Sequence, residues 1–130
     1  MKAFTNINVS SVDEAVSAAA QAHNNGQSVA FSSGGTDLLQ QLKDGTDKSD
    51  VIINLRNVEG AREISSADGT IRIGGLITLD ELSNSDLNDV LTEAAASVGT
   101  PQIRNVATLS GNVTQRPWCW YYRNSFNCYK

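Results

Sequence analysis

Two short glycine-bearing segments, 32–37 (SSGGTD) and 108–112 (TLSGN), constrain this chain more than any other feature. Both offer small side chains and hydroxyl groups, and glycine lets a main chain approach a ligand closely and adopt a positive φ. A helical pattern follows segment 32–37 at once, and the start of a helix carries unpaired N–H groups that attract anions. Together the two segments predict that main-chain amides from two bends converge on the diphosphate of one dinucleotide.

Residues 1–56 carry the pattern of a small, mostly parallel α/β lobe. A capping box from Ser11 to Glu14 begins a first helix that Gly26 ends, and Gly45 ends a second one. The expected order is strand 4–9, helix, strand 28–32, segment 32–37, helix, strand 51–55. The helical face expected to pack on the sheet consists of Val12, Ala15, Val16, Ala19 and Ala22.

Residues 57–130 are expected to form a second lobe. Two short strand patterns flank Asp68 and Gly69, a pair typical of a tight hairpin turn. A second capping box, Thr78 to Glu81, opens a short helix, and Gly99 and Pro101 end a longer one. The apolar face expected for that longer helix consists of Leu87, Val90, Leu91, Ala94, Ala95 and Val98.

The composition changes abruptly after Arg116. Residues 118–130 hold six of the eight aromatic residues and both cysteines, and from residue 94 onward there are four basic residues and no acidic one. We expect the aromatic side chains to pack in a core or an interface. A chain that stops on its densest aromatic cluster is expected to be truncated. Cys119 and Cys128 are compatible with half of an iron–sulfur or zinc site, with a disulfide, or with buried thiols.

The overall charge of −4 and the pI near 4.8 argue against binding to nucleic acid or to a membrane surface. No apolar run approaches the roughly 20 residues of a membrane span. The first residues lack a secretory signal, which predicts a cytoplasmic protein, with periplasmic export alongside a partner as the alternative. A single histidine argues against multi-histidine metal sites.

Neither glycine segment is specific by itself. Segment 32–37 lacks the lysine of a Walker P-loop and the spaced glycines of a Rossmann site, so an ordinary strand-to-helix turn explains it equally well. In segment 108–112 the hydroxyl and amide side chains are also typical of a turn that satisfies its own backbone. Asp37 would repel a phosphate, so we expect it to cap the helix or fix the loop.

Four blocks in order nevertheless resemble the FAD-binding subunits of molybdenum hydroxylases, which include xanthine dehydrogenases, carbon monoxide dehydrogenases, aldehyde oxidoreductases and 4-hydroxybenzoyl-CoA reductases. The blocks are 30–38 (AFSSGGTDL), 51–55 (VIINL), 71–75 (IRIGG) and 102–112 (QIRNVATLSGN). The tail from residue 111 is similar to the branch in which this subunit also carries a [4Fe–4S] cluster. The resemblance implies an α/β, overall α+β, two-lobed FAD-binding fold of the PCMH or molybdopterin dehydrogenase type.

The resemblance also assigns residues. It implies that the FAD-binding residues are Ser32, Ser33, Gly34, Gly35, Thr36, Asp37, Leu38, Thr108, Gly111 and Asn112. Cys119 and Cys128 match the first two of four cluster cysteines, and the other two would lie beyond Lys130.

As implied by the resemblance, the protein is the FAD subunit of an oxidoreductase. Substrate, an aldehyde by preference and otherwise an aromatic heterocycle, is oxidised at molybdenum on a large molybdopterin-binding subunit. Electrons pass through a small [2Fe–2S] subunit to FAD and then to an external acceptor. The alternatives are a non-catalytic α/β module that binds a partner through its aromatic tail, and another two-lobed flavoprotein that oxidises substrate directly.

Overall fold

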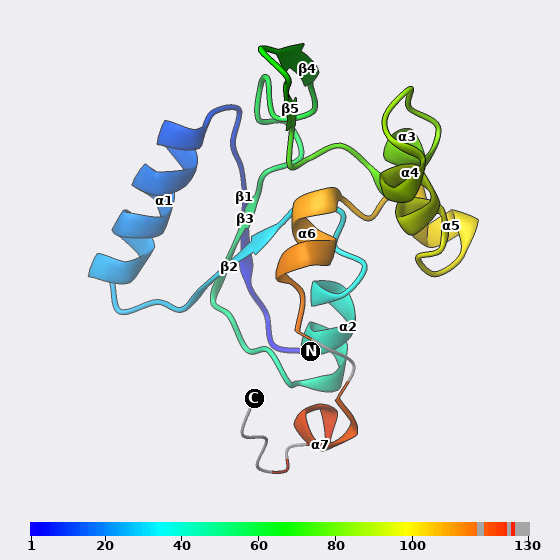
Figure 1. Cartoon of the computed structure of the whole chain (residues 1–130). Helices are drawn as coiled ribbons and strands as arrows, with labels where there is room; N and C mark the ends of the chain where they lie inside the picture. Colours follow the sequence, from blue (N-terminus) through cyan, green and yellow to red (C-terminus); the bar gives the residue numbers. More distant parts are fainter. Residues whose placement is uncertain (117–118, 125, 127–130) are drawn as a thin grey trace.

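The computed structural model describes residues 1–116, 119–124 and 126, and it begins with the predicted α/β lobe. Three parallel strands form a sheet in the order β1-β3-β2, with a helix in each connection (Figure 1). The elements of this lobe are β1 (Thr5–Asn8), α1 (Val12–Asn24), β2 (Val29–Ser32), α2 (Leu38–Asp44) and β3 (Val51–Asn54). The β-α-β-α-β order expected from the sequence is therefore confirmed.

Helix α1 packs through its alanines rather than its valines. Ala15 and Ala22 are buried in a cluster with Val51 and Ile53 of the central strand, and Ala18 and Ala19 pack against it. These four alanines follow the i, i+3, i+4, i+7 spacing of one helical stripe. The expected packing of Val12 and Val16 is wrong, because both lie at the edge of this stripe and remain 64% and 62% exposed.

The first capping box differs from the sequence pattern in one bond. The Ser11 hydroxyl accepts from the Glu14 amide, as predicted. The Glu14 carboxylate, however, accepts from the amide and hydroxyl of Ser10 at 2.7 and 2.9 Å, not from Ser11. These bonds, led by that of the Ser10 amide, hold the pKa of Glu14 below its usual value. The start of α1 is therefore fixed by two consecutive serines.

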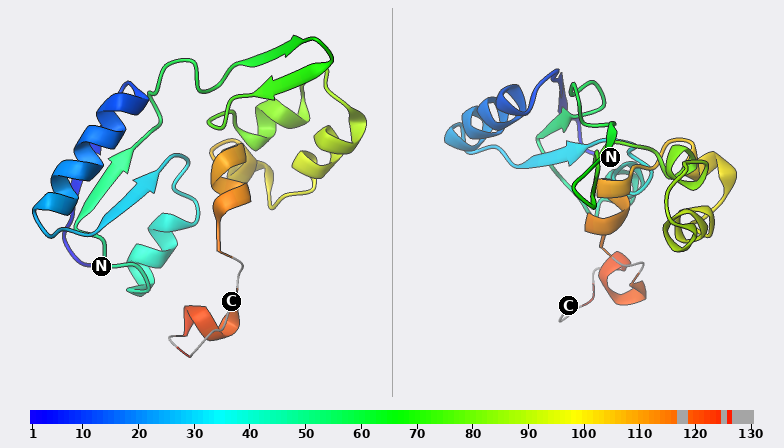
Figure 2. Two further views of the ribbon diagram at one scale, coloured as in Figure 1. Left: turned by 60° about the vertical axis from the view of Figure 1, so that its left-hand side comes forward. Right: turned by 45° about the horizontal axis from the view of Figure 1, so that its top comes forward.

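The second part of the chain combines a hairpin with short helices (Figure 2). The hairpin turn is formed by Asp68 and Gly69, which have φ values of 51° and 72° as a type I′ turn requires. The remaining elements are β4 (Ile64–Ala67), β5 (Thr70–Ile73), α3 (Leu79–Ser83), α4 (Asp89–Ala96), α5 (Pro101–Arg104), α6 (Leu109–Thr114) and α7 (Trp120–Arg123).

A second apolar cluster lies among these helices. Leu79 and Leu82 of α3 pack against Ala95 of α4, with Leu91 at the margin. Val90 and Ala94 were expected on this face but are exposed, Val90 to 76%, because the packed stripe is centred on Leu91, Ala95 and Val98. The first cluster also includes Val58 and Leu76 from the second part of the chain, and the division at residues 56 and 57 stays a prediction. No helix among the described residues is long and apolar enough to span a membrane.

Candidate functional site

The two glycine segments meet where the two parts of the chain touch. A hydrogen bond of 2.7 Å joins Ser33 Oγ to Thr108 Oγ1 across 75 positions of sequence. Beside this bond, Gly34 packs against the backbone of Val106 and Ala107. A Cβ added to Gly34 would lie 2.1 Å from the carbonyl oxygen of Val106. Only glycine fits at this point. The predicted convergence of the two segments is therefore present in the fold.

Backbone pairing holds the second segment in place. Residue Thr108 forms an antiparallel bridge with Thr78, and the amide of Leu79 donates to the Ala107 carbonyl at 2.9 Å. The predicted capping box at Thr78 is complete, with the Glu81 carboxylate accepting from the Thr78 amide at 2.8 Å. The Thr78 amide is the main reason why the pKa of Glu81 is lowered, and Arg62 adds a further ion pair at 2.5 Å.

A cavity of about 580 Å³ opens between the two segments. Its walls come from the loop between β2 and α2, the region between α4 and α6, and the chain that follows α6. All ten residues that the sequence assigned to cofactor binding line it: Ser32, Ser33, Gly34, Gly35, Thr36, Asp37, Leu38, Thr108, Gly111 and Asn112. Its size is in the range typical of cofactor pockets, about 300–1,000 Å³.

The first segment presents a row of available donors. Within the described part of the chain, the amides of residues 34–38 donate to no protein acceptor. Gly35 has a φ of 73°, a left-handed conformation that glycine adopts without strain and that turns the chain toward α2. Successive unpaired amides of this kind form a concave site for an anion. The loop is therefore built to accept negatively charged oxygen atoms.

The second segment differs from the prediction, because it is the first turn of α6 and not a loop. Thr108 caps this helix, and its hydroxyl accepts from the Gly111 amide at 3.2 Å. The amides of Leu109 and Ser110 donate to the carbonyls of Ile77 and Gly75, both at 2.9 Å. Amides 109–111 are thus already used, and the expectation that both segments offer main-chain donors is wrong for this one. It offers side chains and the bare Cα of Gly111.

The carboxylate of Asp37 fixes the loop instead of capping the helix. Asp37 occupies the N-cap position of α2 but makes no side-chain capping bond. It accepts from Gln41 Nε2 at 2.6 Å and forms an ion pair with Arg123 of α7. Of the two roles expected for Asp37, the structure therefore supports the one that fixes the loop.

Comparison with known proteins gives this arrangement a family. A family profile described as "FAD binding domain in molybdopterin dehydrogenase" matches residues 2–118. The chain belongs to this family. Its sequence is 36% identical over 89 residues to the nicotinate dehydrogenase FAD-subunit of Eubacterium barkeri, covering 65% of this chain and 30% of that protein. The suspected relationship and the FAD-binding fold are both confirmed.

Two further relatives extend the comparison of this FAD-binding domain. It is 32% identical over 127 residues to the aldehyde oxidoreductase FAD-binding subunit of Escherichia coli K12, covering 94% of this chain and 38% of that protein. Its fold matches carbon monoxide dehydrogenase from Hydrogenophaga pseudoflava with a TM-score of 0.78 and 26% identity, covering 85% of this chain and 39% of that one. The chain thus spans about a third of the length of its relatives, which are components of oxidoreductases.

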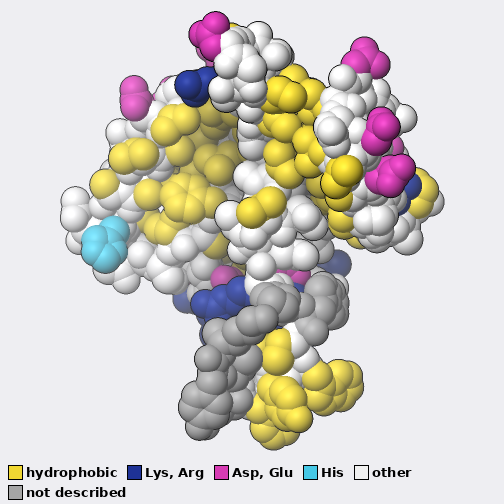
Figure 3. All heavy atoms as spheres, viewed as in Figure 1, with side chains coloured by type: hydrophobic (Ala, Val, Ile, Leu, Met, Phe, Trp, Pro, Cys, Tyr) yellow, Lys and Arg dark blue, Asp and Glu magenta, His cyan; other side chains and the backbone are white. Residues whose placement is uncertain are grey.

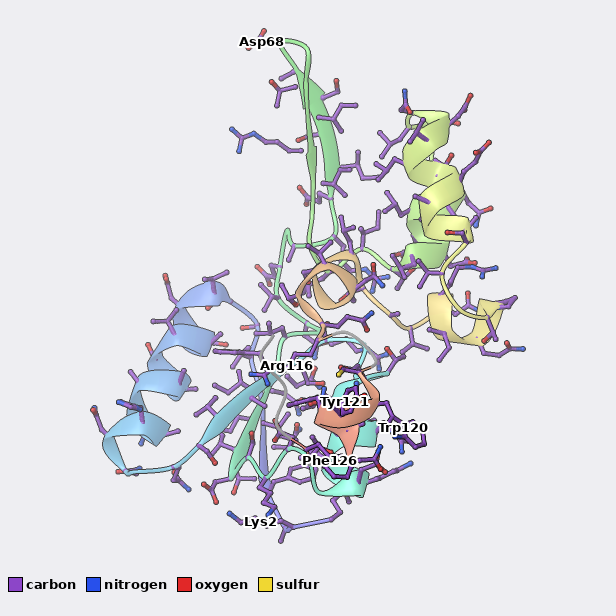
Figure 4. The ribbon with its side chains drawn as sticks, turned by 60° about the horizontal axis from the view of Figure 1, so that its bottom comes forward. Lys2, Asp68, Arg116, Trp120, Tyr121 and Phe126 are labelled. Atoms are coloured by element: carbon purple, nitrogen blue, oxygen red, sulfur yellow. The ribbon has the colours of Figure 1, made fainter. Side chains whose placement is uncertain are left out.

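The tail of the FAD-binding domain contributes side chains that sequence reasoning did not assign to the site. Arg116 and Tyr122 line the cavity, and Arg123 reaches Asp37 at its edge. Figures 3 and 4 show apolar side chains gathered at the surface around α7. Packing in a core or an interface was expected, and three of the aromatic residues are 62–77% exposed, which excludes the core for them and leaves the interface as a prediction: Trp120, Tyr121 and Phe126. The only sequence signal for the tail's role is its excess of basic residues.

The predicted metal ligands are described only in part. Cys119 is half-buried at the start of α7, whereas Cys128 lies outside the described residues. Among residues 1–116, 119–124 and 126, no group of three or more histidine, cysteine or acidic side chains is placed to hold a metal ion. An iron–sulfur cluster takes four protein ligands, so two cysteines of this chain would supply half of them.

Proposed function

We propose that the 580 Å³ cavity binds FAD, with the diphosphate against the amides of residues 34–38. The observation that carries this proposal is the row of five successive amides in the cavity lining that donate to no acceptor among the described residues. Each charge-assisted hydrogen bond from such an amide contributes about 1.5–3 kcal/mol. Several of them together favour a dianionic diphosphate over a neutral ligand.

The opposite wall would hold the cofactor through side chains. The hydroxyls of Ser33 and Thr108 bond each other at 2.7 Å, and each retains capacity for a further bond toward the cavity. Asn112 adds an amide side chain, and the lack of a Cβ at Gly111 leaves the Thr108 hydroxyl in place, since a Cβ there would be 2.9 Å from Thr108 Oγ1. One wall therefore supplies main-chain donors and the other supplies shape and side-chain polarity.

The cofactor's redox chemistry defines the role that we propose for the whole protein. When bound against residues 34–38, FAD would supply the redox chemistry by which electrons reach an external acceptor. We infer that the electrons come from a molybdopterin-binding large subunit through a [2Fe–2S] small subunit. The family description, which names a molybdopterin dehydrogenase, supports the molybdopterin partner, and the [2Fe–2S] subunit is implied by the resemblance alone. A [4Fe–4S] cluster is a further proposal, and it requires two ligands in addition to Cys119 and Cys128. Family membership favours this relay over a non-catalytic partner-binding module.

An aldehyde is the substrate class that we propose for the assembled enzyme. Support comes from the match to the aldehyde oxidoreductase subunit, which extends over 127 residues and therefore reaches the aromatic tail. The match to the nicotinate dehydrogenase subunit spans 89 residues. This choice is tested by isolating the complex from its host and comparing the rate at which it oxidises an aldehyde with the rate at which it oxidises nicotinate. Faster oxidation of nicotinate would assign a heterocyclic substrate instead.

The FAD proposal itself has a direct test. The protein, purified from its natural host without denaturation, should show the visible absorbance bands of a flavin. Heat release of the chromophore and chromatography should identify FAD and not FMN, because the proposed site needs a diphosphate. A colourless protein that also fails to take up added FAD would refute the proposal.

A further inference from the structure

The charged side chains around the cavity come from two distant parts of the chain. The loop and helix region after β2 contributes two carboxylates to the lining, those of Asp37 and Asp47. Among the described lining residues the only basic one is Arg116, which follows α6. Without the residues after α6, the described walls would carry two negative charges and no positive one. Such a cavity would repel a diphosphate.

Of the two carboxylates, that of Asp37 would oppose binding of a diphosphate more strongly. Its own amide belongs to the row of unpaired donors, so its side chain lies beside the proposed diphosphate position. Arg123 forms an ion pair with it, and the two side chains are only 8% and 17% exposed. Charges that are largely withdrawn from water interact strongly, and removing one partner leaves the other uncompensated. Arg123 therefore neutralises a carboxylate that would otherwise oppose anion binding.

Arg116 differs from Arg123 because its charge faces the cavity. Its Cζ lies 4.9 Å from the centroid of the Tyr122 ring, a distance typical of a cation–π contact. Within the described residues no carboxylate lies within 4 Å of it. Figure 4 shows it on the stretch between α6 and α7. The aromatic ring restrains the guanidinium, while its hydrogen-bond donors remain available to a ligand.

We propose that Arg116 and residues 119–124 form the cationic wall of the FAD site. In this wall Arg116 is a binding residue for the diphosphate, and Arg123 is a positioning residue that keeps Asp37 neutralised. The inference rests on the proposed function, since it concerns the affinity of the same site for its anionic cofactor. It also gives the aromatic tail a purpose within this chain, because Tyr122 orients Arg116 and α7 carries Arg123.

The experiment measures the dissociation constant for FAD in the whole protein after removal of its flavin. Arg116→Gln should raise this constant about tenfold, the loss of one charge-assisted hydrogen bond. It should also flatten the dependence of the constant on salt concentration, because salt screens exposed charges. The matched control is Arg72→Gln, which removes the same charge from the exposed strand β5, outside the cavity lining, and should leave the constant unchanged.

The role of Arg123 needs a pair of variants. Arg123→Gln should raise the dissociation constant about 30-fold or more, because truncating one partner of a buried ion pair leaves the other unpaired. Adding Asp37→Asn removes that carboxylate, so the double variant should recover most of the lost affinity. If Arg123 had a merely structural role, the double variant would bind FAD no more tightly than Arg123→Gln alone. Thermal unfolding of each variant identifies any that fail to fold, and the exposed Arg116 remains testable in that case.

The outcomes separate the two proposals. If the unaltered protein does not bind FAD, the proposed function fails. If it binds FAD and the Arg116 and Arg123 variants bind it equally well, the cationic wall is refuted while the proposed function stands. The wall is also refuted if the double variant stays as weak as Arg123→Gln. Affinity lost in Arg116→Gln with an unaltered salt dependence overturns the assignment of Arg116 as a charge donor to the diphosphate.

Discussion

Replacing Gly34 with alanine is the sharpest test of how the two parts of the chain meet. The added Cβ would lie 2.1 Å from the Val106 carbonyl oxygen and 2.9 Å from the Ala107 Cα. Non-bonded atoms attract at about 3.5–4.0 Å, so the carbonyl must retreat by more than 1 Å. Both obstacles are backbone atoms, which cannot rotate away as the end of a side chain can. The only relief is a separation of the two segments.

The cost follows from what that separation disturbs. Overpacking of this kind costs about 1–3 kcal/mol. The same backbone carries the 2.9 Å bond from the Leu79 amide to Ala107, and Thr108 next to it bonds Ser33 at 2.7 Å. Weakening these bonds adds about 1 kcal/mol. We expect Gly34→Ala to lower the free energy of unfolding by about 2–4 kcal/mol and the melting temperature by about 10 °C.

Two measurements on the same samples check this expectation. Thermal unfolding followed by circular dichroism gives the stability, and fluorescence titration gives the FAD affinity, which should fall at least about tenfold as the cavity walls separate. Gly26→Ala is the control, since Gly26 has a φ of 72° but nothing within 4 Å of its Cβ position. It should cost about 1 kcal/mol through backbone strain and leave FAD affinity intact. Normal stability and affinity in Gly34→Ala would refute the close contact.

Three smaller changes test other bonds. Ser33→Ala removes the bond to Thr108 and should cost about 1 kcal/mol in urea unfolding, while an unchanged midpoint would show that the hydroxyl pair contributes nothing. The pKa of Glu81 is lowered in the fold, so its stabilisation is complete above the unfolded pKa of about 4.3 and is lost as the pH falls. The melting temperature of Glu81→Gln should therefore lie below that of the unaltered protein at neutral pH, and the gap should shrink as the pH falls below about 4.3. A constant gap would contradict this. Asp68→Gly relieves a positive φ at the hairpin tip and should gain up to about 1 kcal/mol, and a loss would argue against the type I′ turn.

Local chemistry explains why the order of elements could be predicted from the sequence. Gly26 and Gly45 both adopt the left-handed conformation after a helix, and Asp68 with Gly69 forms the expected turn. Each depends on residues within a few positions of itself. Helix α5 was missed although its signal is local, because Pro101 was interpreted as the end of a helix when, after Thr100, it begins one.

Packing faces were less predictable than element order. The valines of α1 and Val90 of α4 fit an apolar face by spacing, yet all remain exposed. Periodicity identifies an apolar stripe on a helix but does not fix the centre of that stripe to within one residue. A small rotation of the helix about its axis would bury the neighbouring side chains instead. In α1 the alanines fix the centre, since Ala15 and Ala22 are both buried against the sheet.

The lining of the candidate site was predicted only in part, since Arg116 and Tyr122 were not assigned to it, and the roles of its residues were not predictable. The ten assigned residues came from the resemblance, and all ten line one cavity. The role of each residue depends on contacts that are remote in sequence. The Ser110 amide donates to the Gly75 carbonyl, and Asp37 forms an ion pair with Arg123, 86 positions away. No pattern within either segment specifies such partners. Their assignment to FAD stays a prediction until cofactor binding is measured.

The contact of Gly34 with Val106 has a consequence for how the protein is made. A ribosome releases the chain from its N-terminus, so the first lobe emerges well before the residues that complete the cavity wall. Until residue 108 has left the exit tunnel, the donor row of the first loop faces open water and has nothing opposite it. We therefore expect the proposed cofactor to bind only after both segments have been synthesised, and not to guide the folding of the first lobe.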